Sequence, residues 1–346
     1  MGSGASRGTP SRASEMRAIP RTGTMLSALG LGTAQIGGLF RAMSPGDAVE
    51  TLQAAWDSGI RYFDTAPYYG YTRSERRVGG FLSERDRTAF AISTKVGCLM
   101  VPAEAVGREE FGYVDPLPFP ARYDYSHDAI LRSFEDSQQR LGLARVELLY
   151  VHDIGRATHG DRHDLHWHAL TRGGGFRALE ELRRDGRIGG FGLGVNEAAV
   201  VTDALGEADL DAVLLAGRHT LLEQDALPLL DACARAGTAV AAAGPFNSGI
   251  LAGGTTFDYA AAPASVVARV AALKAVCAEF GVPLPAAALQ FPSAHPAVVS
   301  VVAGAQSADQ LRANVADFER PIPAAFWAAL VKGGLVSPAA PLPAGV

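Results

Sequence analysis

Four ionisable side chains each close, or directly follow, a short apolar run: Asp64, Tyr69, Lys95 and His152. Taken singly, each has an ordinary structural explanation, as a loop cap, a packing residue, a solvated charge or a hydrogen-bonded core residue. If the apolar runs are neighbouring parallel strands, however, their carboxyl ends meet on one face and bring the four side chains together. Polar groups at that position are typical of a catalytic site.

An acid–base pair with hydride transfer is the chemistry that these residue types could perform. The phenol of Tyr69 would exchange a proton with the substrate oxygen, and the ammonium group of Lys95 would lower the pKa of Tyr69 toward neutrality. Asp64 would keep Lys95 charged and oriented, and His152 would hydrogen-bond the substrate oxygen. The hydride itself must come from, or go to, a bound cofactor.

The elements that must position these residues alternate between short apolar runs and amphipathic stretches eight times from about Leu26 onward. This alternation predicts a single (β/α)₈ (TIM) barrel of the α/β class. The strand candidates are Leu26–Leu31, Ile60–Asp64, Ala91–Lys95, Glu147–His152, Gly189–Gly194, Ala212–Ala216, Ala239–Ala243 and Val298–Val302. Helix signals agree, for example Ser44 as the N-cap before Pro45.

Three connections after strands are unusually long, and they follow Lys95, His152 and Ala243. Such enlarged βα loops lie on the face that carries barrel active sites. The second loop holds four histidines: His159, His163, His166 and His168. Their spacing matches no regular zinc signature, so we predict no metal and expect this loop to border the substrate pocket.

The segments Gly30–Thr33 and Gly59–Gly70, together with Lys95 and His152, resemble the aldo-keto reductase family. The resemblance covers about residues 26–318, and it implies a catalytic tetrad of Asp64, Tyr69, Lys95 and His152. Tyr69, which directly precedes Gly70, matches the family's tyrosine; Tyr68 does not. Segments 217–223 and 244–249 further resemble NAD-linked aldose 1-dehydrogenases, a branch that includes fucose-, galactose- and pyridoxal-oxidising members.

Three residues depart from what the resemblance leads us to expect. His219 stands where that branch usually has tyrosine, Cys98 where we expect arginine, and Ala243 where many members have a tyrosine stacked on the nicotinamide. The first two departures put the sugar contacts in question, but not the fold or the tetrad.

The resemblance also implies a nicotinamide dinucleotide extended across the barrel mouth, with Asn196 at the carboxamide. Phosphates would meet backbone donors around 246–249 and 304–307, the second of which opens a helix. Gln310 and Asn314 would face the adenosine. The full set of cofactor-binding candidates is Gly32, Thr33, Asn196, Phe246, Asn247, Ser248, Gly249, Gly304, Ala305, Gln306, Gln310 and Asn314.

We expect NAD to be preferred over NADP, because a 2′-phosphate needs lysine or arginine partners. Arg312 is the only cation between Gly304 and Asn314, and helical spacing turns it away from Gln310. Asp309 adds a negative charge.

The expected reaction is hydride transfer between NAD and the anomeric carbon of an aldose, or of a similar cyclic hemiacetal such as pyridoxal, to give a lactone. Two alternatives stay open at this point. One is a general NADPH-dependent carbonyl reductase that uses the same tetrad. The other is a non-catalytic, cofactor-binding regulatory subunit, because fold does not fix function.

The bulk composition limits the other possibilities. A formal net charge of −5 disfavours nucleic acid as a partner, and no uninterrupted apolar stretch predicts a membrane span. Three widely spaced cysteines indicate neither a disulfide framework nor a zinc cluster, so the cytoplasm is the simplest location. The expected partner is a small-molecule substrate, and a homodimer is one assembly that the sequence allows.

The predicted domain organisation has three parts. Residues 1–24 are expected to be a disordered leader or cloning remnant, residues 25–335 the barrel, and residues 336–346 a C-terminal tail.

Overall fold

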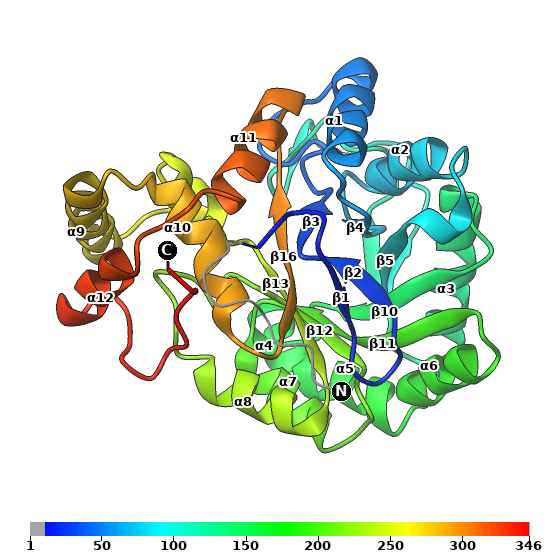
Figure 1. Ribbon diagram of the computed structural model, residues 1–346. Helices are drawn as coiled ribbons and strands as arrows, with labels where there is room; N and C mark the ends of the chain where they lie inside the picture. Colours follow the sequence, from blue (N-terminus) through cyan, green and yellow to red (C-terminus); the bar gives the residue numbers. More distant parts are fainter. Residues whose placement is uncertain (1–10, 346) are drawn as a thin grey trace.

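In the computed structural model, which describes residues 11–345, eight parallel strands close into a barrel with helices around it (Figure 1). Around the barrel the strand order is β10-β11-β12-β13-β16-β3-β4-β5. The (β/α)₈ prediction is confirmed. The strands are β3 (Leu29–Gly32), β4 (Tyr62–Asp64), β5 (Ala91–Val96), β10 (Val146–His152), β11 (Ile188–Val195), β12 (Ala212–Ala216), β13 (Ala239–Ala243) and β16 (Val298–Gly304).

A short antiparallel hairpin precedes the barrel and corrects two expectations. It consists of β1 (Met16–Ala18) and β2 (Met25–Ser27), and it places Ile19 and Leu26 in the cluster of buried side chains that fills the barrel interior. Leu26 therefore belongs to the hairpin, and the first barrel strand begins only at Leu29. The leader expected over residues 1–24 is wrong for residues 11–24, because the barrel interior needs apolar side chains at its open end; residues 1–10 lie outside the described residues.

Helices pack on the outside of the barrel, and their apolar sides form the larger core with the outward faces of the strands. As predicted, Ser44 caps the first helix, and its hydroxyl accepts a hydrogen bond from the Asp47 N–H. The helices are α1 (Pro45–Asp57), α2 (Arg73–Leu82), α3 (His127–Leu141), α4 (Arg156–His159), α5 (His163–Thr171), α6 (Gly175–Arg184), α7 (Ala198–Leu205), α8 (Leu227–Ala236), α9 (Ala264–Phe280), α10 (Leu284–Gln290), α11 (Ala308–Phe318) and α12 (Ala324–Lys332).

The three long loops after strands carry secondary structure of their own. After β5 come two small hairpins, β6 (Cys98–Met100) with β9 (Ala121–Tyr123) and β7 (Glu109–Glu110) with β8 (Tyr113–Val114). After β10 come α4 and α5. After β13 come a 3₁₀ segment, 247–252, and the hairpin of β14 (Thr256–Phe257) and β15 (Ala260–Ala261).

The end of the chain packs on the barrel's outside. In the tail expected at 336–346, Val336 and Ala340 are buried, and the Ser337 N–H donates to the side chain of Gln224. α12 packs against α9, at the left of Figure 1. None of the helices in the described part of the chain is long and apolar enough to cross a membrane.

Candidate active site

A buried ion pair lies where β4 and β5 end. Nζ of Lys95 donates to both carboxylate oxygens of Asp64 at 2.9 and 2.8 Å, and to the carbonyl of Thr65 at 2.9 Å. The hydroxyl of Ser93 donates to the same carboxylate at 2.7 Å. Both charged side chains are almost wholly buried. The lysine's three N–H groups are thus all used, which fixes its position.

Tyr69 and His152 complete the predicted cluster. Nζ of Lys95 lies 4.7 Å from the centre of the Tyr69 ring, over its face. The rings of Tyr69 and His152 meet edge to face with centroids 5.9 Å apart. The four residues predicted from their positions after strands are therefore brought together at the carboxyl ends of β4, β5 and β10.

The expected effect of Lys95 on Tyr69 is not found in this structure. Burial, and next the Asp64 carboxylate, raise the pKa of Tyr69 well above its ordinary value. The physical reason is that Asp64 compensates the lysine's charge at hydrogen-bond distance, so little positive potential is left for the phenol. Tyr69 is consequently protonated at neutral pH and ready to donate a proton.

His152 is a neutral imidazole. Burial, and next the charge of Lys95, lower the pKa of His152 well below its ordinary value. Its Nδ1 is buried and has no hydrogen-bond partner among residues 11–345. A proton on Nδ1 would be an unsatisfied buried donor, so the tautomer with the proton on Nε2 is favoured.

A cavity opens in front of this cluster. It is lined by Tyr69, Lys95, His152 and the predicted Asn196, and by residues that sequence reasoning missed. The missed residues are Phe40, Tyr68, Phe111, Tyr113, Asp153 and Tyr259. Only Asp153 carried a local signal, because it directly follows His152. The aromatic residues come from loops after different strands, and no spacing in the sequence links them.

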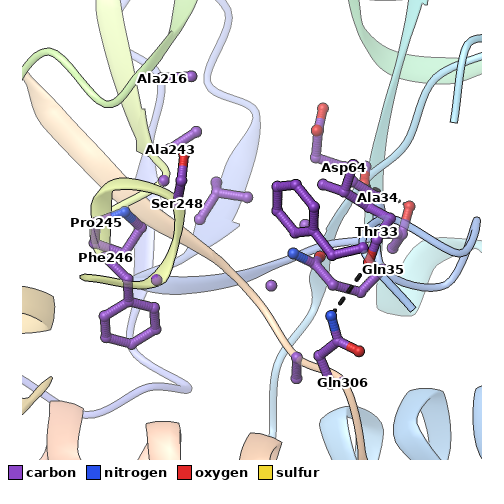
Figure 2. A pocket seen from close by; sticks show the side chains of 18 of the residues that line it. Thr33, Ala34, Gln35, Asp64, Ala216, Ala243, Pro245, Phe246, Ser248 and Gln306 are labelled. Carbon is purple, nitrogen blue, oxygen red and sulfur yellow. Dashed lines mark hydrogen bonds between the residues drawn. The ribbon is translucent and has the colours of Figure 1, made fainter. Parts of the chain in front are cut away.

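A second cavity continues from the first into a groove between the loops after β13, β16 and β3. Tyr69 and Tyr259 line both cavities. Figure 2 shows Pro245, Phe246 and Ser248 on one wall and Thr33, Gln35 and Gln306 on the other. Of the predicted cofactor residues, those that line this groove are Gly32, Thr33, Phe246, Ser248, Gly249, Gly304, Ala305, Gln306 and Gln310.

Two predicted cofactor residues lie behind the groove wall instead. Asn247 is buried, and its side chain accepts a hydrogen bond from Thr220 at 2.6 Å and donates to the Gly217 carbonyl at 3.2 Å. Asn314 is buried too and donates to the Gly304 carbonyl at 3.2 Å. Both asparagines tie loop backbones together, which the sequence pattern alone could not distinguish from ligand contacts.

The residues that depart from the family pattern are placed as follows. Cys98 and His219 are buried and line neither cavity, whereas Ala243 lines the groove. His219 packs on Phe291 with ring centroids 5.3 Å apart. The two departures that put the sugar contacts in question therefore lie away from the cavities.

The histidine cluster does not border the substrate cavity, contrary to the expectation. His159 and His166 pack against each other behind it with ring centroids 4.3 Å apart and planes inclined at 41°, and His159 pairs with the hydroxyl of Tyr125 at 2.8 Å. The reason is that the loop folds into α4 and α5, which turn these rings inward. Between residues 11 and 345, no three His, Cys, Asp or Glu side chains are arranged to hold a metal ion.

Comparison with known proteins gives a consistent assignment. The sequence model of the Aldo/keto reductase family matches residues 28–332. The chain is 53% identical to a pyridoxal 4-dehydrogenase of Microbacterium luteolum, over 94% of this chain and 99% of that protein. It is 40% identical to a D-threo-aldose 1-dehydrogenase of a Pseudomonas species, over 92% and 97% of the two chains. These relatives match the branch that the sequence resembles.

Solved structures agree on the fold. An aldo-keto reductase from Bacillus halodurans in its holo form superposes with a TM-score of 0.71 at 22% identity, covering 94% of this chain and 97% of that one. A glycerol dehydrogenase from Gluconobacter oxydans superposes with a TM-score of 0.70 at 23% identity, covering 94% and 98%. With the family match over most of its length, this chain belongs to the aldo/keto reductase family and is an oxidoreductase.

Proposed function

We propose that this protein oxidises a cyclic hemiacetal, either an aldose at its anomeric carbon or a similar compound such as pyridoxal, to a lactone with NAD. The observation that carries the proposal is the position of Tyr69 where the two cavities join, beside the Asp64–Lys95 pair and the neutral His152. A substrate in the first cavity and a cofactor in the groove would meet at this phenol.

Two features of the groove support a bound dinucleotide. Glycines line it: a Cβ on Gly304 would meet the Gln35 side chain, and Gly249 has a φ of 105° with open space in front of it, where a ligand could approach the backbone. Next to it, α11 begins at Ala308 with Ser307 as its N-cap, so its N-terminus offers a partial positive charge for phosphate. When bound, the nicotinamide would accept the hydride.

The protein's own residues would handle the substrate oxygen and its proton. Nε2–H of His152 would hydrogen-bond that oxygen and set its angle to the phenol of Tyr69. In its phenolate form, whose population rises with pH, Tyr69 would take the hydroxyl proton during oxidation, and in its phenol form it would donate one during reduction. Lys95 and Asp64 would hold the Tyr69 ring in place through the lysine's contact with its face.

The cation distribution supports NAD over NADP. Within residues 11–345, no lysine or arginine lines the groove. Arg312 points away from it and pairs with Asp309 at 2.9 Å on the exposed surface of α11. A 2′-phosphate in the groove would therefore lack a charge-assisted partner.

The relatives' printed activities support the substrate class. The two proteins most similar to this chain among those compared above oxidise pyridoxal and D-threo-aldoses according to their names. Both compounds form cyclic hemiacetals, and oxidation of a hemiacetal carbon gives a lactone. The cytoplasmic location and a homodimeric assembly stay predictions.

A substrate panel tests the proposal. The purified protein is assayed with NAD and with NADP for oxidation of L-fucose, galactose and pyridoxal, and with the reduced cofactors for reduction of simple aldehydes. We expect hemiacetal oxidation with a higher kcat/KM for NAD than for NADP. Activity confined to NADPH-dependent aldehyde reduction would refute the proposed direction and cofactor.

The role of Tyr69 is tested in the same assay. Tyr69→Phe should lower turnover by about 10²–10⁴-fold, the range for general acid–base groups, while the affinity for NAD stays unchanged. Tyr68→Phe serves as the matched control, because Tyr68 lines the substrate cavity but lies outside the groove. Equal turnover of Tyr69→Phe and wild type would contradict the assignment.

A further inference from the structure

Asp153 follows the last residue of β10 and holds an unusual backbone conformation. Its φ is 46°, in the left-handed region that aspartate enters at a cost. The conformation is fixed by a hydrogen bond from the Asp153 N–H to the Gly194 carbonyl at 3.0 Å. As a result the carboxylate faces the substrate cavity, where 31% of the side chain is accessible.

The carboxylate has no donor within the described chain. No side-chain or backbone N–H or O–H of residues 11–345 donates a hydrogen bond to it, and Oδ2 lies 3.5 Å from Nε2 of His152, too far for a good hydrogen bond. Lys95 cannot serve it, because all its N–H groups are directed to Asp64 and Thr65. A half-buried carboxylate without donors is costly unless a ligand supplies them.

The position of the Asp153 carboxylate relative to His152 limits which group of a ligand could donate to it. Nε2 of His152 is the expected donor to the reacting oxygen, and the carboxylate of Asp153 lies beside this nitrogen. The Asp153 carboxylate accepts and cannot donate, so it is suited to a hydroxyl and not to the carbonyl-derived oxygen. A hydroxyl on the carbon next to the reacting carbon lies beside the reacting oxygen. It could therefore donate to the Asp153 carboxylate while the reacting oxygen accepts from Nε2 of His152.

We infer that Asp153 is a specificity residue that accepts a hydrogen bond from a hydroxyl on the carbon adjacent to the reacting carbon. The inference rests on the proposed function and names the feature by which an aldose is recognised at that site. Burial raises the pKa of Asp153 to about 6, so the group is charged at neutral pH. A charged acceptor gives the stronger hydrogen bond.

Two substrate pairs that differ only in this hydroxyl test the inference. In the reductive direction they are 2-hydroxypropanal and propanal, and in the oxidative direction an aldose and its 2-deoxy analogue. For wild type, kcat/KM should favour the hydroxylated member of each pair. In Asp153→Asn this preference should fall about tenfold, and in Asp153→Gly about tenfold to a hundredfold, because hydrogen bonds to charged groups are the stronger class.

Both variants suit the local backbone. Asparagine tolerates a positive φ and keeps the side-chain shape, and glycine adopts this φ freely. Asp115→Asn is the matched control, since Asp115 has the same φ of 46° but pairs with Arg108 on the exposed loop between β8 and β9. This control should leave both preferences unchanged.

The outcomes separate the inference from the proposed function. Loss of the preference in both Asp153 variants, with kcat/KM for propanal within a few-fold of wild type, supports the inference. An equal loss for propanal and 2-hydroxypropanal, or a wild type without preference, would overturn it. A wild type that prefers 2-hydroxypropanal but oxidises no hemiacetal would refute the proposed function alone.

Discussion

Asp153→Asn should make the folded protein more stable than wild type at pH 8, and the gain should vanish in acid. Burial raises the pKa of Asp153 from 3.8 to about 6, with Glu197 raising it and Lys95 lowering it. The ionised carboxylate of Asp153 is therefore less stable in the folded state than in the unfolded chain. That pKa difference corresponds to about 3 kcal/mol if the group were fully shielded. Because 31% of the side chain meets solvent, we expect about 1–2 kcal/mol.

The sign follows from proton linkage. A group whose pKa is raised on folding contributes stability that is present below its unfolded pKa and is lost as the pH rises through its folded pKa. Wild type should thus lose stability relative to Asp153→Asn between about pH 4 and pH 6, and the difference should be constant above about pH 7. The titratable and charged groups around Asp153 are His152, Lys95, Glu197, Cys98, Tyr68, Tyr69, Tyr113, Tyr123, Tyr125 and Tyr259.

Urea unfolding followed by circular dichroism at pH 4.5, 6 and 8 measures this difference. About a third of the charge effect is already present at pH 4.5, so the change from pH 4.5 to pH 8 separates the remainder from effects that do not depend on pH, such as the better fit of asparagine to a φ of 46°. Asp115→Asn, with the same φ, is the control for removing a surface carboxylate. A difference that is the same at all three pH values would refute the reasoning, because it would show that Asp153 loses no free energy on ionising in the fold.

Three further outcomes are expected. Lys95→Met should lower the free energy of unfolding in urea by about 3–5 kcal/mol, because it leaves the buried Asp64 carboxylate without its partner. Adding Asp64→Asn to this variant should restore more than about 1 kcal/mol, and strictly additive effects of the two substitutions would contradict the coupling. Gly37→Ala should lower kcat about 10–100-fold, because the added Cβ would stand 2.7 Å from the Tyr69 backbone and displace it. The control Gly80→Ala lies on an open helix face; it should leave kcat unchanged and raise the free energy of unfolding by about 0.5–1 kcal/mol. Since the pKa of Tyr69 is raised, kcat for oxidation should increase from pH 7 to pH 10, and a flat profile would count against Tyr69 as the base.

The barrel could be predicted from the sequence because each strand is buried on both faces. Near-continuous apolar runs such as 212–216 and 239–243 are therefore placed with the bounds that the structure has. The first strand was misplaced because Leu26 and Leu29 are both apolar but serve different cores. Leu26 fills the barrel interior from the hairpin, and nothing in its neighbours' residue types marks that change.

The clustering of the four candidate catalytic residues could be predicted because the carboxyl ends of parallel barrel strands meet on one face. The electrostatics could not. Whether Lys95 lowers the pKa of Tyr69 depends on how completely Asp64 compensates the lysine, which is a matter of distances of 2.8 and 2.9 Å and not of residue types. Asn247 and Asn314 show the same limit, because an asparagine that binds a loop carbonyl and one that binds a ligand look alike in sequence.

The cavity in front of Tyr69 is lined by several residues with unusual backbone geometry. Four residues that line it have positive φ without being glycine: Phe40, Phe111, Asp153 and Tyr259. Such conformations cost free energy and persist where the surrounding structure imposes them, which is common at ligand sites. Asp153 adds the cost of an unpaired charge to that of its backbone. Asp153→Gly would remove both costs and Asp153→Asn that of the charge, and a bound hydroxyl group that donates to the carboxylate would offset them in the wild type.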